Sequence, residues 1–164
     1  MTPAERRVLI DSYGRAAAEL EAALAELPAA LWTWRPAPDQ WTVHEIVLHI
    51  TDSEANSYVR ARRFIAEPGR GLMGYDERAW AERLHYHALP PAEAVELFRS
   101  LRRSTYRLIQ TLPEIAWAHT AVHSESGLMT LDDWLVIYER HVRDHVAQMQ
   151  AVRAAWEQAG RPAA

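Results

Sequence analysis

The signal for the start of a helix occurs three times in this chain, each time before a long stretch with apolar residues spaced three and four apart. In this signal, called a capping box, a threonine side chain accepts a hydrogen bond from the backbone amide three residues later, and an acidic side chain at that position returns one. The pairs are Thr2 with Glu5, Thr42 with Glu45, and Thr130 with Asp133. Long amphipathic helices are therefore the main constraint on the fold.

Proline and glycine residues divide the chain into four helical segments. The predicted helices run from Thr2 to Pro28, from Thr42 to about Ala66, from Pro90 to Pro113, and from Thr130 to Gly160 and Pro162. No segment keeps a strand-like alternation for long. The pattern predicts an all-α four-helix bundle that occupies residues 1–164 as a single domain.

Two connecting segments are longer than the others. Residues 67–90 form a connector that is predicted to contain a short helix near Asp76 to Arg83, and residues 113–129 are predicted to be irregular. A helix of about 24 residues is about 36 Å long, and a connector of about the same number of residues can extend past it. The second and third long helices can therefore run parallel in an up-down-down-up order, although the simple up-down order also remains open.

Composition limits the chemistry that the chain can perform. It contains no cysteine, and all 18 of its basic residues are arginines. A disulfide framework, a cysteine-ligated metal, a thiol nucleophile and a catalytic lysine are excluded, so a metal would need histidine, aspartate or glutamate ligands. The formal net charge of -4 does not suit a nucleic-acid partner. The absence of a signal-like segment or a long apolar run predicts a cytoplasmic protein without membrane contact.

Histidines interrupt the apolar stripe of the last predicted helix. His141 and His145 are four residues apart, so their side chains can point toward one metal ion. His49, on the inward face of the second helix, is the best third ligand. Three histidine ligands leave one or more coordination positions of the ion open, as in catalytic zinc sites. Because the three ligands are neutral, the ion keeps its full positive charge. The alternative is a pair of histidines that is either exposed to solvent or satisfied by hydrogen bonds in the core.

Other polar residues are weaker candidates. Ser53, Tyr138 and Gln148 lie about one turn from the three histidines, where they could orient an imidazole, contact a substrate or be ordinary half-buried residues. His44 lies on a different side of its helix from His49, and surface positions are the default for the remaining histidines, although they could line the mouth of a site. The remaining histidines are His85, His87, His119 and His123. The helical positions of three nearby acids do not place them at the ion: Asp52, Glu54 and Asp144. No catalytic residue is assigned.

Two segments together resemble the DinB-like superfamily and its YfiT-like branch. They are RPAPDQWTVHEIVLHITDSE, which contains His49, and YERHVRDHVAQM, which contains His141 and His145. The resemblance extends from about Glu5 to Trp156. It implies a four-helix bundle in up-down-down-up order, a divalent ion, nickel or zinc, bound by these three histidines at one end of the bundle, and a homodimer. It does not imply DNA binding.

The activities of similar proteins suggest what such a site does. They include the transfer of low-molecular-weight thiols such as bacillithiol to electrophiles and the mycothiol-dependent isomerisation of maleylpyruvate, and other members carry the name of metal-dependent hydrolases. An ion with open positions can lower the pKa of a bound thiol, so the protein needs no cysteine of its own. We therefore expect a metal-dependent thiol S-transferase that acts on a small molecule. The alternatives are a metal-dependent hydrolase and a non-catalytic, metal-stabilised binding or dimerisation module.

Overall fold

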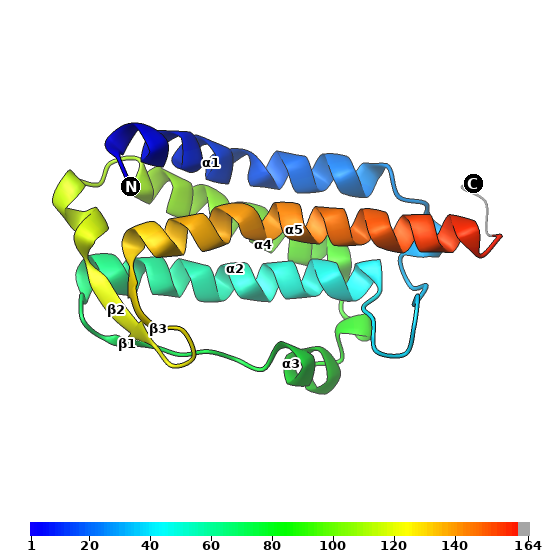
Figure 1. The fold of residues 1–164 in the computed structure, drawn as a ribbon. Helices are drawn as coiled ribbons and strands as arrows, with labels where there is room; N and C mark the ends of the chain where they lie inside the picture. Colours follow the sequence, from blue (N-terminus) through cyan, green and yellow to red (C-terminus); the bar gives the residue numbers. More distant parts are fainter. Residues whose placement is uncertain (161–164) are drawn as a thin grey trace.

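Four long helices form the body of the structure, a computed structural model that describes residues 1–160 (Figure 1). They are α1 (Pro3–Ala25), α2 (Val43–Ala66), α4 (Pro91–Ile109) and α5 (Leu131–Gln158). Figure 1 shows α1 and α5 running in one direction and α2 and α4 in the opposite one. The predicted four-helix bundle and its up-down-down-up order are confirmed, and the simple up-down alternative is wrong.

Capping boxes begin three of the long helices, as predicted. The hydroxyl groups of Thr2, Thr42 and Thr130 accept hydrogen bonds from the backbone amides three residues later, at 3.3, 3.1 and 3.1 Å. The fourth long helix, α4, begins at Pro91 without a side-chain cap. At the other end of the chain, α5 is followed by Gly160 at a φ of 73°, a left-handed conformation that glycine adopts readily. Pro162, the other expected stop residue, lies outside the described residues.

The segment between α2 and α4 returns along the length of the bundle, which allows these two helices to run parallel (Figure 1). It contains a short helix, α3 (Glu77–Arg83), and a 3-10 turn, η2 (Tyr86–Ala88). The Asp76 side chain caps α3 by accepting a hydrogen bond from the Ala79 amide at 2.9 Å. The short helix predicted near residues 76–83 is therefore confirmed.

The two long connectors form a three-stranded sheet, although the sequence predicted residues 113–129 to be irregular. The strands β2 (Thr120–His123) and β3 (Gly127–Thr130) form an antiparallel hairpin, and β1 (Gly71–Leu72) pairs in parallel with β2. These strands have only two to four residues, too few to produce a recognisable alternation in the sequence. Two further 3-10 turns, η1 (Ala29–Leu31) and η3 (Glu114–Ala118), complete the connections.

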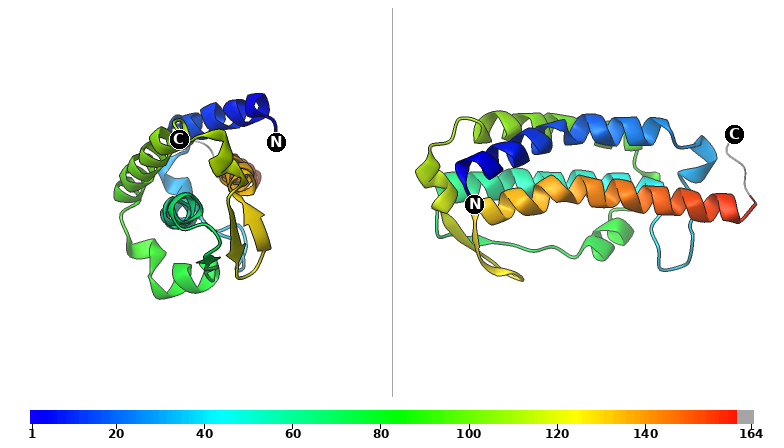
Figure 2. Two further views of the ribbon diagram at one scale, coloured as in Figure 1. Left: turned by 90° about the vertical axis from the view of Figure 1, so that its left-hand side faces the viewer. Right: turned by 45° about the horizontal axis from the view of Figure 1, so that its top comes forward.

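The sheet and α3 lie on one side of the bundle. Viewed along the helices, they stand beside α2 and α5, on the side away from α1 and α4 (Figure 2, left). None of the helices within residues 1–160 combines the length and the apolar character needed to cross a bilayer. The face of α2 and α5 toward α3 is where the candidate site is found.

The apolar core forms two clusters that meet near the middle of α5. One cluster contains the α5 residues Leu131, Trp134, Leu135 and Tyr138, and the other contains Val142, Met149, Val152 and Trp156. His141 lies between the two clusters along the helix. The predicted apolar stripe of the last helix is confirmed, together with its interruption by histidine.

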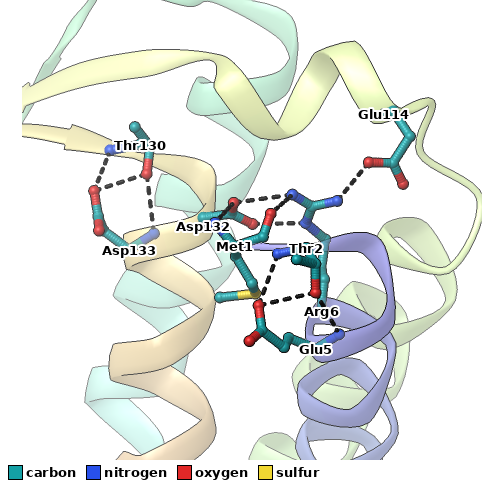
Figure 3. A network of polar contacts seen from close by, with 8 residues as sticks. All are labelled: Met1, Thr2, Glu5, Arg6, Glu114, Thr130, Asp132 and Asp133. Atoms are coloured by element: carbon teal, nitrogen blue, oxygen red, sulfur yellow. Dashed lines mark hydrogen bonds and ion pairs between the residues drawn. The ribbon is translucent and has the colours of Figure 1, made fainter.

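An arginine network joins α1 to the beginning of α5 at the end of the bundle far from α3 (Figure 3). Arg6 donates two hydrogen bonds to the Asp132 carboxylate at 2.6 and 2.9 Å, and a third to Glu114 at 2.6 Å. Its guanidinium carbon also lies 4.9 Å from the centre of the Trp117 ring. These contacts tie three segments together where the chain begins.

Candidate metal centre

The three histidines singled out in the sequence meet in the structure. His49 comes from the first half of α2, and His141 and His145 come from the middle of α5. One ring nitrogen of each lies within 4.8 Å of those of the other two. The Nε2 atoms of His141 and His145 are 3.2 Å apart. This arrangement can hold one metal ion.

Burial keeps these imidazoles uncharged. His49 is only 3% exposed, and its burial, together with the nearby His145, lowers its pKa to about 3. Burial and the neighbouring histidines lower the pKa of His141 to about 2. Burial also lowers the pKa of His145, although the hydrogen bond with Gln148 acts in the opposite direction. Metals bind the neutral form of imidazole, so the rings are in the binding form at neutral pH.

The geometry of the donors fits a divalent ion. Zinc–nitrogen bonds of about 2.0–2.1 Å place the ligand atoms of a tetrahedral site about 3.3 Å apart. The Nε2 atoms of His141 and His145 already have about this separation. The ligand atoms of the three histidines lie up to 4.8 Å apart, so binding an ion would require side-chain shifts of about 1 Å. The Nδ1 atom of His49 is buried without a hydrogen-bond partner among residues 1–160. No hydrogen bond within residues 1–160 holds the His49 ring, so the ring is free to bind an ion.

Gln148 fixes the orientation of one imidazole. Its Oε1 atom lies 2.8 Å from Nδ1 of His145. A carbonyl oxygen only accepts hydrogen bonds, so Nδ1 carries the ring proton and Nε2 keeps its lone pair. The sequence-based expectation that Gln148 could orient an imidazole agrees with this contact.

A carboxylate that the sequence did not identify lies beside the cluster. The Oε2 atom of Glu77, at the beginning of α3, is 3.5 Å from Nε2 of His49, and its side chain is 57% exposed. The short helix α3 has no fully buried residue. Its Trp80 ring contacts the Tyr75 ring, with 4.6 Å between the ring centres. Glu77 lies in a connector, where helical periodicity carries no information about which way a side chain faces.

Two open clefts flank the histidine cluster. The cleft that we call the Trp41 cleft has a volume of about 380 Å³ and is lined by Trp41, His49, Glu77, Arg78, His145 and Gln148, among others. The second, which we call the Arg60 cleft, has a volume of about 540 Å³. Its lining includes His49, Ser53, Arg60, Tyr75, Glu77, Arg78, His123, Tyr138 and His141. Both clefts therefore reach His49 and Glu77.

The other residues expected near the site have different positions. Ser53 and Tyr138 lie in the wall of the Arg60 cleft. His123 lines the same cleft and is only 8% exposed, so it has the alternative position, at the mouth of a site, and not the default surface position. The unpredicted strand β2 holds it there. The remaining histidines lie away from the cluster, as expected: His44, His85, His87 and His119.

Three acids that are near the ligands in sequence have other partners. Glu54 forms an ion pair with Arg102 in the core at 2.6 Å. Asp52 accepts a hydrogen bond from the Tyr86 hydroxyl. Asp144 forms an exposed ion pair, at 2.9 Å, with the arginine one turn earlier on α5. None of them is in the cluster.

Comparison with known proteins connects this geometry to a family. A model of the DinB superfamily matches residues 12–149. A relative from Oceanobacillus iheyensis, named "Putative metal-dependent hydrolase OB0782", is 30% identical over 112 residues, which are 68% of this chain and 64% of the relative. "Putative metal-dependent hydrolase YfiT" of Bacillus subtilis is 29% identical over 110 residues, which are 66% of this chain and 62% of that protein. This chain thus matches just under two thirds of the length of these relatives.

The fold also matches a solved structure. YfiT from Bacillus subtilis, described as "a probable metal-dependent hydrolase with an unusual four-helix bundle topology", superimposes with a TM-score of 0.87 at 23% identity. The match covers 99% of this chain and 91% of that one. The two proteins therefore share the four-helix bundle over nearly the whole of this chain. With the family match over residues 12–149, these findings show that the protein belongs to the DinB superfamily, in its YfiT-like branch.

Proposed function

We propose that His49, His141 and His145 bind one divalent metal ion, zinc or nickel, and that the protein uses it to transfer a low-molecular-weight thiol to a small electrophile. The neutral, closely spaced imidazoles support the metal site. The names of the relatives support metal-dependent catalysis in general. The thiol as nucleophile is supported by what the family resemblance implies and by the arrangement of the clefts.

The two clefts are the observation that carries the choice of a transfer reaction. A transfer between two organic molecules requires that both bind next to the catalytic group at once. The Trp41 cleft and the Arg60 cleft lie beside the same histidine cluster, with volumes of about 380 and 540 Å³. Hydrolysis would need room for only one organic molecule and a water. A thiol in one cleft and an electrophile in the other can both reach the space beside His49.

The protein's own residues prepare the reacting groups. A divalent ion held by neutral ligands supplies a Lewis acid that lowers the pKa of a nucleophile bound to it. Glu77 accepts the thiol proton, since its carboxylate reaches His49 and remains exposed enough to pass the proton to water. The sulfur then bonds to the electrophilic carbon as the leaving group departs with its electron pair. Gln148 keeps His145 in the tautomer that can bind metal.

Metal-dependent hydrolysis is the second candidate, favoured by the names of the relatives. It would use the same histidines and Glu77, with water in place of the thiol. A non-catalytic, metal-stabilised binding or dimerisation module would need an enclosed ion without an adjoining cavity, whereas this cluster opens onto two clefts. A homodimer, a cytoplasmic location and the absence of a nucleic-acid partner remain predictions that accompany the proposal.

The test is a turnover assay with and without a thiol. Protein loaded with zinc or nickel is incubated with bacillithiol or mycothiol and monobromobimane, and the thioether product is measured against metal-free protein and His145→Ala. Because monobromobimane also reacts slowly with free thiols, the rate is compared with that background, and we expect thioether formation above it only with metal, thiol and intact His145. Turnover of p-nitrophenyl acetate without any thiol, with no thioether formed, would instead support the hydrolase. Failure of both assays with fully loaded protein would contradict an enzymatic role.

A further inference from the structure

Arg60 presents its positive charge to a cleft in which it has no acidic partner. Its Nη1 atom donates to the Tyr138 hydroxyl at 2.6 Å, and its Nη2 atom donates to the backbone carbonyl of Met73. Both acceptors are neutral, and no carboxylate within residues 1–160 forms an ion pair with Arg60. A guanidinium has five N–H donors, so donors remain for a ligand. The side chain is half-buried in the wall of the Arg60 cleft.

His123 adds a second donor to the same wall. The backbone amides of Glu125 and Ser126 lie 3.2 and 3.3 Å from its Nδ1 atom and donate to it. Burial and the nearby Arg60 charge lower the pKa of His123, so the ring is neutral. A neutral imidazole that accepts at Nδ1 carries its proton at Nε2. His123 therefore keeps an N–H donor that none of its hydrogen bonds within residues 1–160 uses.

Tyr138 connects this donor group to the histidine cluster. Its hydroxyl accepts from Arg60, which leaves its own proton available for a ligand. The centre of its ring is 6.2 Å from that of His141, on the same helix. His49 and His141 lie in the same cleft as Arg60 and His123. A molecule in this cleft can thus reach both the donors and the proposed metal site.

The charges around the cleft favour a small carboxylate over a polyphosphate or a nucleic-acid backbone. Asp76, Glu77 and Glu125 are exposed and lie along the same cleft. These acids would repel a polyphosphate or a nucleic-acid backbone. Each carboxylate group carries a single negative charge, less than a phosphate chain, and its two oxygens match the planar guanidinium. Small size would let it pass the acidic residues and reach Arg60.

We propose that Arg60, His123 and Tyr138 bind a carboxylate group of the small molecule that occupies the Arg60 cleft. This inference names the substrate class for the proposed function and rests on it for the reaction that follows binding. The carboxylate site itself requires no metal, because none of its three donors belongs to the histidine cluster. Binding can therefore be measured separately from turnover.

The experiment uses the full chain after treatment with a bipyridine chelator and gel filtration, which remove metal without adding carboxylate. Succinate and its uncharged analogue succinamide are titrated into the wild type, and binding is followed by calorimetry and by the NMR signals of the histidine rings. Arg60→Gln removes the charge. Arg63→Gln is the matched control, since Arg63 lies on the same helix and donates to the Gly71 carbonyl at 2.9 Å but does not line the cleft.

We expect succinate to shift the His123 ring signals of the wild type and succinamide to have no such effect. Arg60→Gln should raise the dissociation constant of succinate about tenfold or more, and Arg63→Gln should leave it unchanged. Equal binding of succinate and succinamide by the wild type would overturn the proposal without any variant. Unchanged succinate binding in folded Arg60→Gln would do the same. If succinate binds as expected but the metal-loaded enzyme shows no turnover, the proposed function fails and the carboxylate site stands.

Discussion

Glu54 and Arg102 form an ion pair inside the bundle, with 2.6 Å between Oε2 and Nη2, and each side chain is only 1% exposed. The pair joins α2 to α4. Arg102 also donates to the backbone carbonyl of Tyr138 on α5 at 3.1 Å, and Tyr13 of α1 donates to Glu54 at 2.6 Å. All four long helices therefore meet at this pair, and on α2 Glu54 follows the candidate ligand His49 by five residues.

Removing the carboxylate should destabilise the whole bundle. Glu54→Gln leaves the charge of Arg102 buried without its counterion, and we expect the free energy of unfolding to fall by about 3–5 kcal/mol. Urea denaturation followed by circular dichroism measures this change. Glu19→Gln is the control, because it breaks an exposed pair with Arg15 on α1 and should cost less than about 1 kcal/mol. Equal stabilities of the two variants would show that the buried pair has no such role.

The Arg6 network should stabilise the fold without affecting the site. Arg6→Gln removes the charge-assisted hydrogen bonds to Asp132 and Glu114 shown in Figure 3. We expect a loss of about 1.5–3 kcal/mol in the free energy of unfolding. Metal content after purification should equal that of the wild type. A loss of metal in a folded Arg6→Gln variant would contradict this prediction, because it would mean that the two ends of the bundle are coupled.

Gln148 should determine how tightly metal binds. Gln148→Ala frees the His145 ring to rotate or to change tautomer, so metal affinity should fall about 10–100-fold. Competition with a chromophoric chelator gives the dissociation constant. Gln148→Glu keeps an acceptor at this position and should restore most of the affinity, and Gln150→Ala, exposed on the same helix, should have no effect. An unchanged affinity in Gln148→Ala would contradict the orienting role.

Glu77 should affect turnover more than metal binding. Glu77→Gln keeps the size of the side chain but cannot accept the proton of the nucleophile, so we expect kcat to fall about 10²–10⁴-fold. Glu82→Gln on the same short helix is the control and should keep full activity. Metal content, measured in parallel, should not change in either variant. If Glu77→Gln instead loses the metal and the activity together, Glu77 is a ligand and not the proton acceptor.

The sequence identified the parts of the site that lie on long helices. Spacing of four along α5 placed His141 and His145 on one face, and the inward face of α2 contained His49, because helical geometry alone fixes these directions. Glu77 and His123 could not be placed in this way. They lie on a short helix and a short strand whose positions depend on contacts between residues about 50 apart, such as the pairing of Gly71 with Val122.

The cleft beside Arg60 could not be predicted from the sequence either, although Arg60 lies on a long helix. Its position on α2 is fixed by the helix, but the cleft exists only because the returning connector and β2 stand beside that helix. Strands of two to four residues leave no periodic pattern that would reveal this arrangement. The bundle and the histidine cluster were therefore predictable, and the residues that line the clefts beside the cluster were not.

Elemental analysis of freshly purified protein by mass spectrometry shows directly whether the three histidines hold a metal ion. We predict one zinc or nickel ion per chain in the wild type and a loss of most of this metal in His49→Ala and in His145→Ala, with His44→Ala as a control that keeps it. A three-histidine metal site would be contradicted by a folded triple variant, with His49, His141 and His145 all replaced by alanine, that still contains one ion per chain. A wild-type protein that takes up no divalent ion would contradict it as well.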